Sequence, residues 1–184
     1  MSNENQPNGK VKAEVYDWIQ SILYALVICV LLFVFAVRMV NVDGDSMYPT
    51  LENGDRVLIS NLFYKPKQGD IVVLRKDVFM YEPIVKRVIA VEGQRIDFDF
   101  DKGIVMVDGE VLNEPYINDL TYTRITCPDS VTVPECCVFV MGDNRNASTD
   151  SRLFEVVGCV DTRYIQGRVY VTLFPLKNFG WEAK

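Results

Sequence analysis

Ser46 is the residue in this chain with the clearest potential as a nucleophile. It lies in the segment Val42-Asp-Gly-Asp-Ser-Met-Tyr-Pro-Thr-Leu51, a turn bounded by glycine and proline. Such a turn presents a hydroxyl group and lets backbone N–H groups point outward, where they can stabilise a developing oxyanion. Most serines in turns only cap or form local hydrogen bonds, so this segment taken alone favours the local role.

Lys86 has the surroundings that a general base requires. In the predicted strand Ile84–Val91 it shares one face with apolar residues such as Ile84 and Val88. An apolar face desolvates the amine and lowers its pKa, and a neutral lysine can accept a proton, whereas Arg87 on the opposite face cannot. The more common arrangement, an edge-strand lysine that extends to water, stays open as an alternative.

The segment Met141-Gly-Asp-Asn-Arg-Asn-Ala-Ser-Thr-Asp-Ser-Arg152 forms a third polar cluster. It is dense in turn formers and hydrogen-bonding groups. Pairing of Asp143 and Asp150 with Arg145 and Arg152 would make it a rigid loop held by charge-assisted hydrogen bonds. The alternative is a solvated surface loop, whose individual charges contribute little to stability.

Composition restricts the chemistry further, because none of the 184 residues is histidine. This excludes Ser-His-Asp and Cys-His mechanisms and nearly all catalytic zinc arrangements. A base near neutral pH must then be Lys, Asp, Glu, Tyr or Cys. The net charge of −6 gives no electrostatic reason to bind nucleic acid, and no Gly-rich phosphate-binding loop is present. We therefore expect no cofactor, no metal and no nucleic-acid partner.

The five cysteines leave two redox states open. Cys29 lies in an apolar run and is expected to act there as a small hydrophobic residue. The others, Cys127, Cys136, Cys137 and Cys159, lie in the part that we place outside the cytoplasm. A disulfide from Cys127 to Cys136 or Cys137 would suit that location, and free thiols in a reducing or anaerobic setting are an equal alternative.

An apolar run from Trp18 to Val37 predicts one membrane-spanning helix. A helix of about 20 residues at ~1.5 Å per residue spans the ~30 Å hydrocarbon core. Tyr16 and Trp18 suit one interface and Arg38 the other. A buried core helix or a cleaved signal peptide are the alternatives, but the run is long for a signal peptide and no A-x-A-like site closes it. The expected parts are a disordered cytoplasmic tail over 1–15, a transmembrane helix over 16–38 and a catalytic domain over 39–184.

Short segments rich in β-branched and aromatic residues follow the helix and predict a mostly β, antiparallel domain. Asp108-Gly109 between two apolar runs predicts a hairpin. A short amphipathic stretch near Tyr164 is the one helical feature expected there. The less apolar segment over about 98–134 predicts a small second β lobe. The expected strands are Arg56–Ser60, Asp70–Arg75, Ile84–Val91, Arg95–Phe100, Ile104–Leu112, Cys136–Met141 and Arg168–Phe174.

Taken together, these clusters resemble the bacterial type I signal peptidases, the leader peptidases that cut signal peptides from exported proteins. Each block alone is modestly specific, but their order and spacing make the resemblance strong. One anchor helix and a small second lobe are similar to the short, Gram-positive form of the family. The blocks that carry the resemblance are Gly44–Leu51, Asn53–Ile59, Gly69–Val72, Lys86–Ala90 and Gly142–Arg152.

The resemblance implies a serine–lysine pair. Ser46 would attack the scissile carbonyl, and Lys86, as a neutral amine, would remove the serine's proton and later protonate the leaving amine. Ser148 lies where the family places a hydroxyl group that orients the lysine. The residues that would support this loop are the salt-bridged Asp150 and Arg152, the structural Arg87, and the frame of Asp143, Asn144 and Arg145.

The resemblance also implies a substrate and a location. Shallow apolar pockets would accept the small side chains of A-x-A-like ends of signal peptides. The family's topology implies a single-pass plasma-membrane protein, with its N-terminus in the cytoplasm and its catalytic domain outside, near the export machinery. Charges beside the helix give only a weak orientation signal. The residues assigned to substrate binding are Val42, Gly44, Met47, Ile84 and Val85.

Two departures from the family pattern affect the site. Some members carry a serine two positions before the nucleophile and use its hydroxyl in the oxyanion hole, but this chain has Gly44 there. The hole would then rest on backbone N–H groups, notably that of Ser46, and its second donor is unassigned. The family usually has a glycine sooner after the arginine that Arg152 matches. In this chain five residues, Leu-Phe-Glu-Val-Val, separate Arg152 from Gly158.

The anchor helix would hold the site near the membrane. Ser46 follows the helix by about eight residues, which at ~3.3 Å per residue places it within roughly 25 Å of the bilayer surface. Exposed apolar residues would help the domain rest on that surface, and core packing explains each of them equally well. These residues are Met47, Tyr48, Phe63, Tyr64 and Trp181.

Two rival functions share part of this pattern. The self-cleaving repressor type of serine–lysine protease has a similar turn, but it carries a DNA-binding helix-turn-helix in place of an apolar anchor. A membrane-tethered β module that binds a partner and has lost activity is the second rival. It would have no need to keep Ser46, Lys86, Ser148 and Asp150 together.

Overall fold

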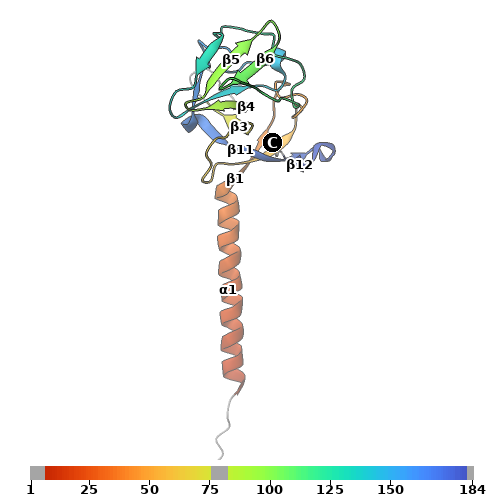
Figure 1. Cartoon of the computed structure of the whole chain (residues 1–184). Coiled ribbons are helices and arrows are strands. Elements are labelled where there is room, and N and C mark those ends of the chain that lie inside the picture. Colours follow the sequence, from red (N-terminus) through yellow and green to blue (C-terminus); the bar gives the residue numbers. More distant parts are fainter. Residues whose placement is uncertain (1–6, 76–82, 182–184) are drawn as a thin grey trace, which may run out of the picture. The chain divides into compact units, whose positions relative to one another are not determined.

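The computed structural model describes residues 7–75 and 83–181, without the side chains of 7–11, 32–36 and 181. The chain forms two compact units, Met1–Val37 and Arg38–Lys184. The first contains a single helix and the second a domain built of strands (Figure 1).

Helix α1 extends over Pro7–Ala36. Proline suits the first turn of a helix, where its missing N–H costs nothing, and the lysines, alanine and glutamate that follow are good helix formers. The helix therefore begins well before residue 16, the expected start, and takes in the second half of the predicted tail. Residues 1–6 of that tail lie outside the described residues.

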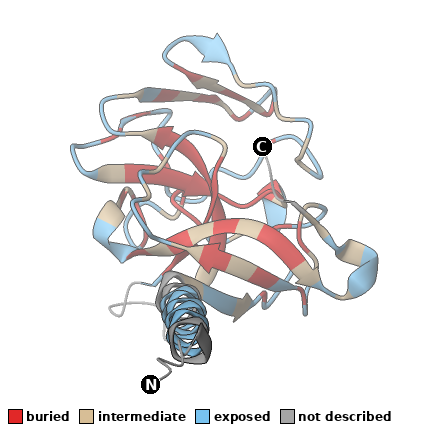
Figure 2. Ribbon diagram, turned by 90° about the horizontal axis from the view of Figure 1, so that it is seen from below, coloured by how far each residue is buried: buried red, intermediate tan, exposed pale blue. Residues whose placement is uncertain are grey.

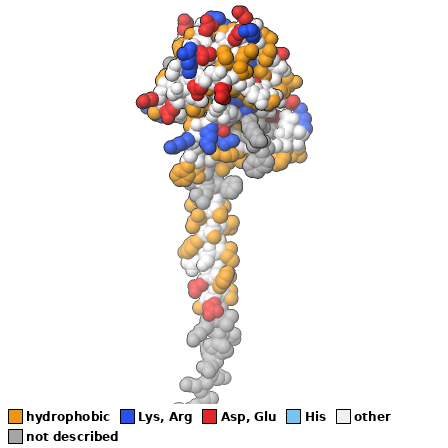
Figure 3. All heavy atoms as spheres, in the orientation of Figure 1, with side chains coloured by type: hydrophobic (Ala, Val, Ile, Leu, Met, Phe, Trp, Pro, Cys, Tyr) orange, Lys and Arg blue, Asp and Glu red, His pale blue; other side chains and the backbone are white. Residues whose placement is uncertain are grey.

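Within α1, the segment Lys12–Leu31 is long and apolar enough to cross a membrane. None of this segment is buried. Its side chains are mostly hydrophobic, with acidic ones toward one end (Figure 3). The core helix of a soluble protein would be mostly buried, so the exposure of this helix favours a membrane span.

Most strands of the β-domain belong to one sheet, whose order is β1-β2-β11-β3-β4-β9-β10, with β12 paired to β11. The pairs from β2 to β10 along this path are antiparallel, as expected from the sequence. Register shifts in β11 let this long strand bend and pair with both β2 and β3. The strands are β1 (Val37–Asn41), β2 (Arg56–Ser60), β3 (Ile71–Leu74), β4 (Ile84–Val91), β9 (Cys137–Met141), β10 (Val160–Asp161), β11 (Ile165–Phe174) and β12 (Gly180–Trp181).

A second, four-stranded sheet has the order β7-β6-β5-β8. Its strands are β5 (Arg95–Asp99), β6 (Ile104–Val107), β7 (Glu110–Val111) and β8 (Ser130–Thr132). The predicted hairpin joins β6 to β7. Asp108 and Gly109 both have positive φ there, 53° and 83°, as the common two-residue hairpin turn requires.

The two sheets share one hydrophobic core. Ile89 and Phe139 of the first sheet pack with Ile96, Val105 and Val131 of the second. Buried residues accordingly lie along the strands of both sheets (Figure 2). The second sheet begins at Arg95, slightly before the predicted lobe, and it belongs to the same compact unit as the first.

Strand β4 is the element that positions the site. It lies between β3 and β9, and its six inner residues are buried on both faces. Strand β9 ends at Met141, and the polar loop that follows contains the 3₁₀ helix η1 (Arg145–Ala147). Two further 3₁₀ helices are η2 (Thr162–Tyr164), at the place of the predicted amphipathic stretch, and η3 (Leu176–Asn178).

Candidate active site

The turn that carries Ser46 is fixed by hydrogen bonds from both sides. Gly44 has a φ of 83°, which favours glycine at this position. Its N–H donates to Asn53 Oδ1 at 3.1 Å. Asn144 donates its backbone N–H to the Ser46 carbonyl at 3.0 Å and its Nδ2 to the Asp45 carbonyl at 3.1 Å. The loop after β9 thus holds the serine in place.

Lys86 reaches Ser46 from near the start of β4. Its Nζ lies 2.6 Å from Ser46 Oγ and 2.9 Å from the Val85 carbonyl oxygen. The residue is only 3% exposed. This burial lowers the pKa of Lys86 from 10.5 to about 8, although the carboxylates of Asp150 and Asp143 oppose the shift. A substantial neutral fraction near physiological pH follows, which an arginine could not provide.

Arg87 points away from Lys86 and binds the loop after β9. Its Nε and Nη2 donate to Asp143 at 2.8 and 2.7 Å, and its Nη1 donates to the Gly69 carbonyl at 2.9 Å. Both members of the ion pair are almost fully buried. Thr50 adds a 2.5 Å hydrogen bond to Asp143. A paired, hydrogen-bonded charge of this kind fixes geometry more than it adds stability.

Asp150 and Arg152 form a second buried ion pair in the same loop. Arg152 Nη2 lies 2.8 Å from Asp150 Oδ2, and neither side chain is exposed. Asp150 also accepts from the Gly142 N–H at 3.0 Å, and Arg152 donates to the Thr123 carbonyl at 3.1 Å. The pair therefore joins the end of β9 to a distant segment of the chain.

Arg145 is the third buried arginine around the site, after Arg87 of β4 and Arg152 of the loop, and its partners were not predicted. It forms an ion pair with Glu114 and donates to Thr121 Oγ1 at 2.8 Å. Tyr116 of the same segment stacks on Arg87, with 3.9 Å between the guanidinium carbon and the ring centroid. The segment of residues 113–127, called the strap below, thereby contacts all three arginines, since the Thr123 carbonyl that accepts from Arg152 also belongs to it. The sequence Asn113-Glu-Pro-Tyr116 carries no periodic signal that would have revealed this role.

Ser148 lies beside the pair but makes no hydrogen bond to it. Its Oγ is buried and has no hydrogen-bond partner within the described part of the chain. The hydroxyl packs against Gly142, where a Cβ atom would overlap it. Any side chain larger than hydrogen at position 142 would displace Ser148 or the Ser46 carbonyl.

A cavity of about 270 Å³ opens beside Ser46 and Lys86. Its size suits small side chains, and it lies between the serine turn, the start of β4 and the loop after β9. All five residues assigned to substrate binding line it, although Val42 and Met47 also belong to the core. Its lining consists of Val42, Asp43, Gly44, Asp45, Ser46, Met47, Ile84, Val85, Lys86, Ala147 and Thr149.

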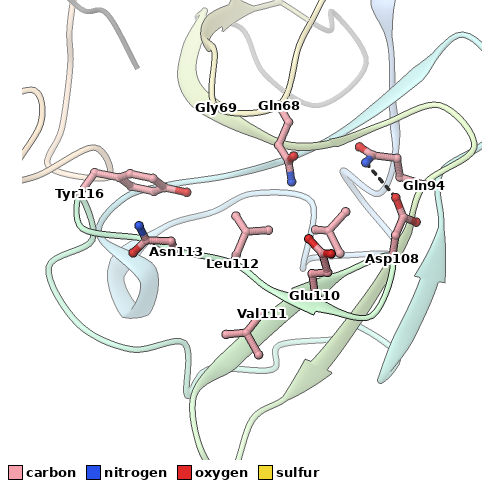
Figure 4. A pocket seen from close by; sticks show the side chains of 10 residues that line it. Gln68, Gly69, Gln94, Asp108, Glu110, Val111, Leu112, Asn113 and Tyr116 are labelled. Atoms are coloured by element: carbon pink, nitrogen blue, oxygen red, sulfur yellow. Dashed lines mark hydrogen bonds between the residues drawn. The ribbon is translucent and has the colours of Figure 1, made fainter.

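A larger cavity of about 450 Å³ lies elsewhere, between the first sheet and the β6–β7 hairpin (Figure 4). Gln68, Gln94 and Asn113 contribute amide groups to its walls, and Tyr116 closes one side. None of the described residues that line it is a serine, cysteine or lysine. Its described lining has no residue in common with that of the cavity beside Ser46, so the two cavities are separate.

All five cysteines carry free thiols in this structure, so the disulfide proposed among them is not formed. Burial raises the pKa of Cys127 to about 12 and that of Cys159 to about 11, which keeps both thiols protonated and unreactive. Among the described residues, no group of three or more Cys, Asp or Glu is placed to hold a metal ion.

Comparison with known proteins identifies the family. A family model described as "Signal peptidase, peptidase S26" matches residues 15–174. The chain belongs to this family. The resemblance seen in the sequence blocks is thereby confirmed, and the self-cleaving repressor alternative is set aside. A signal peptidase is a peptidase, hence a hydrolase, and its name gives the signal peptides of preproteins as its substrate.

Curated signal peptidases match over almost their whole length. A protein named probable signal peptidase I-1 from Synechocystis sp. is 36% identical over 187 residues, covering 96% of this chain and 91% of the relative. Signal peptidase IB from Staphylococcus aureus is 32% identical over 190 residues, covering 92% and 94%. A crystal structure of signal peptidase I from Enterococcus faecalis is 29% identical, with a TM-score of 0.46, and covers 57% of this chain and 97% of that one.

Proposed function

We propose that this signal peptidase is a membrane-bound serine endopeptidase that removes signal peptides by acyl-enzyme chemistry at Ser46 and Lys86. The observation that carries the proposal is the 2.6 Å approach of Lys86 Nζ to Ser46 Oγ inside a buried site. A nucleophile and a base within hydrogen-bond reach are what this chemistry needs. The absence of histidine from the chain leaves no imidazole to take the role of the base.

In the proposed reaction the neutral Lys86 amine accepts the proton of Ser46 Oγ as the oxygen attacks the scissile carbonyl carbon. The resulting ammonium group then gives this proton to the leaving amine, and an ester to Ser46 remains. Lys86 next removes a proton from water, which attacks the ester carbonyl carbon. The bond from this carbon to Ser46 Oγ then breaks, Lys86 returns the proton to Ser46 Oγ, and the new carboxyl terminus is released. Ser148 would orient the lysine. The ion pairs Asp143–Arg87 and Asp150–Arg152 would hold the loop after β9, which carries Ser148.

The oxyanion hole would use the backbone N–H of Ser46. Within the described part of the chain this N–H has no acceptor, so it is free to bind the developing negative charge. The Gly44 N–H is engaged with Asn53 Oδ1 and is unsuited to be the second donor in this conformation. The position of the second donor stays unassigned.

The substrate would be an extended peptide that ends in small residues of the A-x-A kind. The small cavity beside Ser46, with Ile84 and Val85 in its wall, supports this assignment. The exposed apolar segment of α1 supports a single membrane span. We place the N-terminus in the cytoplasm and the β-domain outside, near the export machinery, because signal-peptide cleavage sites emerge there.

The test is cleavage of a preprotein by the detergent-solubilised full chain. We expect one cut after a small residue, and loss of the cut in both Ser46→Ala and Lys86→Ala with unchanged thermal unfolding. Retained cleavage by Lys86→Ala would refute the mechanism. Failure of the unmutated chain to cut several preproteins would favour the module that binds a partner without catalysis.

A further inference from the structure

Two acidic side chains flank the nucleophile, and the reaction described above gives neither of them a role. Asp43 and Asp45 line the same cavity as Ser46 and Lys86. Both are exposed, and neither has an ion-pair partner within the described part of the chain. Unpaired carboxylates next to a forming oxyanion are unfavourable for catalysis on an uncharged substrate, so their presence calls for a physical account.

The other charges around the cavity cancel. Asp143 is paired with Arg87, and Asp150 is paired with Arg152. Among the described residues that line the cavity, Lys86 is the only cationic one, and it is uncharged when it acts as a base. Within this part of the chain, the active form therefore carries two negative charges in this wall that no cation offsets. Charge of one sign acts more strongly in a cleft with low-dielectric walls than on an open surface.

The backbone that carries these carboxylates is held in a fixed position. The hydrogen bond from Gly44 N–H to Asn53 anchors the turn between them. The Asp45 carbonyl accepts both from Asn144 Nδ2 and from the Tyr48 N–H at 3.1 Å. The backbone that carries the two acidic side chains therefore cannot move away from Ser46 without breaking these contacts.

We propose that Asp43 and Asp45 set a charge preference at this site, favouring substrates with a basic side chain within two residues of the scissile bond and disfavouring acidic ones. The assignment rests on the proposed peptidase function, since it needs a peptide at Ser46. Neighbouring Cα atoms are ~3.8 Å apart, so two residues span about 7 Å. This reach is shorter than the Debye length of about 8 Å at physiological ionic strength, and salt therefore screens the interaction only in part.

The preference acts on the transition state as well as on binding. Negative charge forms on the carbonyl oxygen beside the two carboxylates, which repel it. A basic side chain in the substrate offsets this repulsion, and an acidic one adds to it. The effect therefore belongs in kcat/KM and must weaken as salt is raised.

The experiment uses the detergent-solubilised full chain and peptides of one sequence with a small residue before the cut. Each of the positions within two residues of the scissile bond, on both sides, is varied in turn, except those that carry the required small residues. The varied position holds Lys, Gln or Glu. At low ionic strength we expect kcat/KM to be about tenfold higher with Lys than with Glu at the responsive position, with Gln between them. At 0.5 M NaCl the ratio should fall to about twofold.

The double variant Asp43→Asn with Asp45→Asn should bring the ratio of Lys to Glu close to one at low salt. The control variant Glu110→Gln with Glu135→Gln changes the net charge equally at exposed positions of the other part of the domain and should keep the ratio. The two single variants, each with an intermediate ratio, cover the case in which the double variant fails to fold.

Each outcome decides the proposal. Equal rates for all three peptides at low salt, or a ratio that survives the Asp43 and Asp45 substitutions, would overturn the charge preference and leave the peptidase function intact. A ratio that falls equally in the control variant would assign the preference to net charge and not to these residues. Cleavage of none of the peptides would contradict the peptidase function itself.

Discussion

Lys86 works as a base only while it is unprotonated, so its burial has a direct consequence for the pH profile. With a pKa of about 8, the neutral fraction falls about tenfold for each pH unit below this value. We expect log kcat/KM on a neutral peptide to rise with a slope near one up to about pH 8 and to level off above it. Initial rates in buffers of constant ionic strength measure this.

A flat profile from pH 6 to pH 9 would exclude Lys86 as the base. The matched control is thermal unfolding over the same range, which separates titration of the base from loss of the fold. The peptide should have no ionisable side chains, so that charge interactions of the substrate with Asp43 and Asp45 do not affect the pH profile.

The same burial makes Lys86 a source of instability near neutral pH. Its pKa is lower in the folded than in the unfolded chain, so the unfolded state binds more protons between about pH 8 and pH 10.5, and stability rises with pH there. Below that window the folded state bears the full desolvation penalty, roughly 3 kcal/mol for a shift of this size. Lys86→Met should therefore unfold at higher temperature than the unmutated protein at pH 7, with a smaller difference at pH 10. A difference that grows with pH would contradict this account.

Local signals in the sequence supplied only part of the residue pair. The lack of histidine required another base, and alternation along Ile84–Val91 placed Lys86 among apolar neighbours. The turn around Ser46 taken alone favoured a local role, and the pairing of Ser46 with Lys86 was implied by the family resemblance. Glu114 could not be predicted, because it meets Arg145 only after the chain has returned from the second sheet. The prediction that Met47 is exposed was wrong, because its side chain is 1% exposed and packs in the core.

The strap is the element whose importance emerges only in three dimensions. Glu114 is the charged partner of Arg145, and the Arg145 side chain is fully buried. Removing one member of a buried ion pair leaves an unpaired charge and typically costs about 3–5 kcal/mol. Glu114→Gln should therefore lower the melting temperature clearly and reduce kcat, since Arg145 belongs to the loop that holds Ser46. Calorimetry and peptide cleavage measure the two effects.

Two further variants sharpen this prediction. Glu110→Gln removes an exposed carboxylate and should leave both properties unchanged. Arg145→Met combined with Glu114→Gln removes the stranded charge and should recover part of the lost stability. The contradicting outcome is additivity. If Arg145→Met lowers the free energy of unfolding by the same amount with and without Glu114→Gln, the two residues act independently and the strap has another function.

At the scale of elements, strands with strong β signals were predicted well. Strand β4 has the predicted limits, and the Asp108-Gly109 turn makes the predicted hairpin. Short strands such as β8 and β10 were missed, because two or three residues give no pattern until a partner strand pairs with them. The second lobe was predicted as a small part of the same domain, but the sequence did not show that its core is continuous with that of the first sheet, because this contact depends on residues far apart in sequence.

At the scale of the whole molecule, the fold shows where the chain enters the β-domain. Strand β1 lies at one edge of the first sheet beside β2. Val42 accepts from Gly54 N–H and donates to the Asp55 carbonyl, so the two strands run antiparallel from this point. Arg38, the first residue of the domain, is thus at the same end of the sheet edge as Ser60, the last residue of β2.

The loop that follows Ser60 exposes two large apolar side chains at this end. Phe63 is 96% exposed and Leu62 is 55% exposed. The exposed Lys65 follows within the same loop and suits the headgroups of anionic lipids. The apolar segment Lys12–Leu31 of α1 precedes Arg38 in the chain, so this end of the sheet is the one nearest in sequence to the segment that we propose to span the membrane. The Trp181 side chain, also expected at the membrane, lies outside the described residues.

We therefore expect Leu62→Ser with Phe63→Ser to slow cleavage of a preprotein held in anionic liposomes, with no change for a short soluble peptide in detergent. Burial of a phenylalanine in an apolar phase is worth about 2 kcal/mol, so the liposome rate should fall about tenfold or more. Val111→Ser is the matched control, since Val111 is 65% exposed on β7 in the second sheet and should not affect either rate. Equal losses with both substrates would show that the loop acts on the site and not on the membrane. An unchanged liposome rate would show that α1 alone holds the domain at the bilayer.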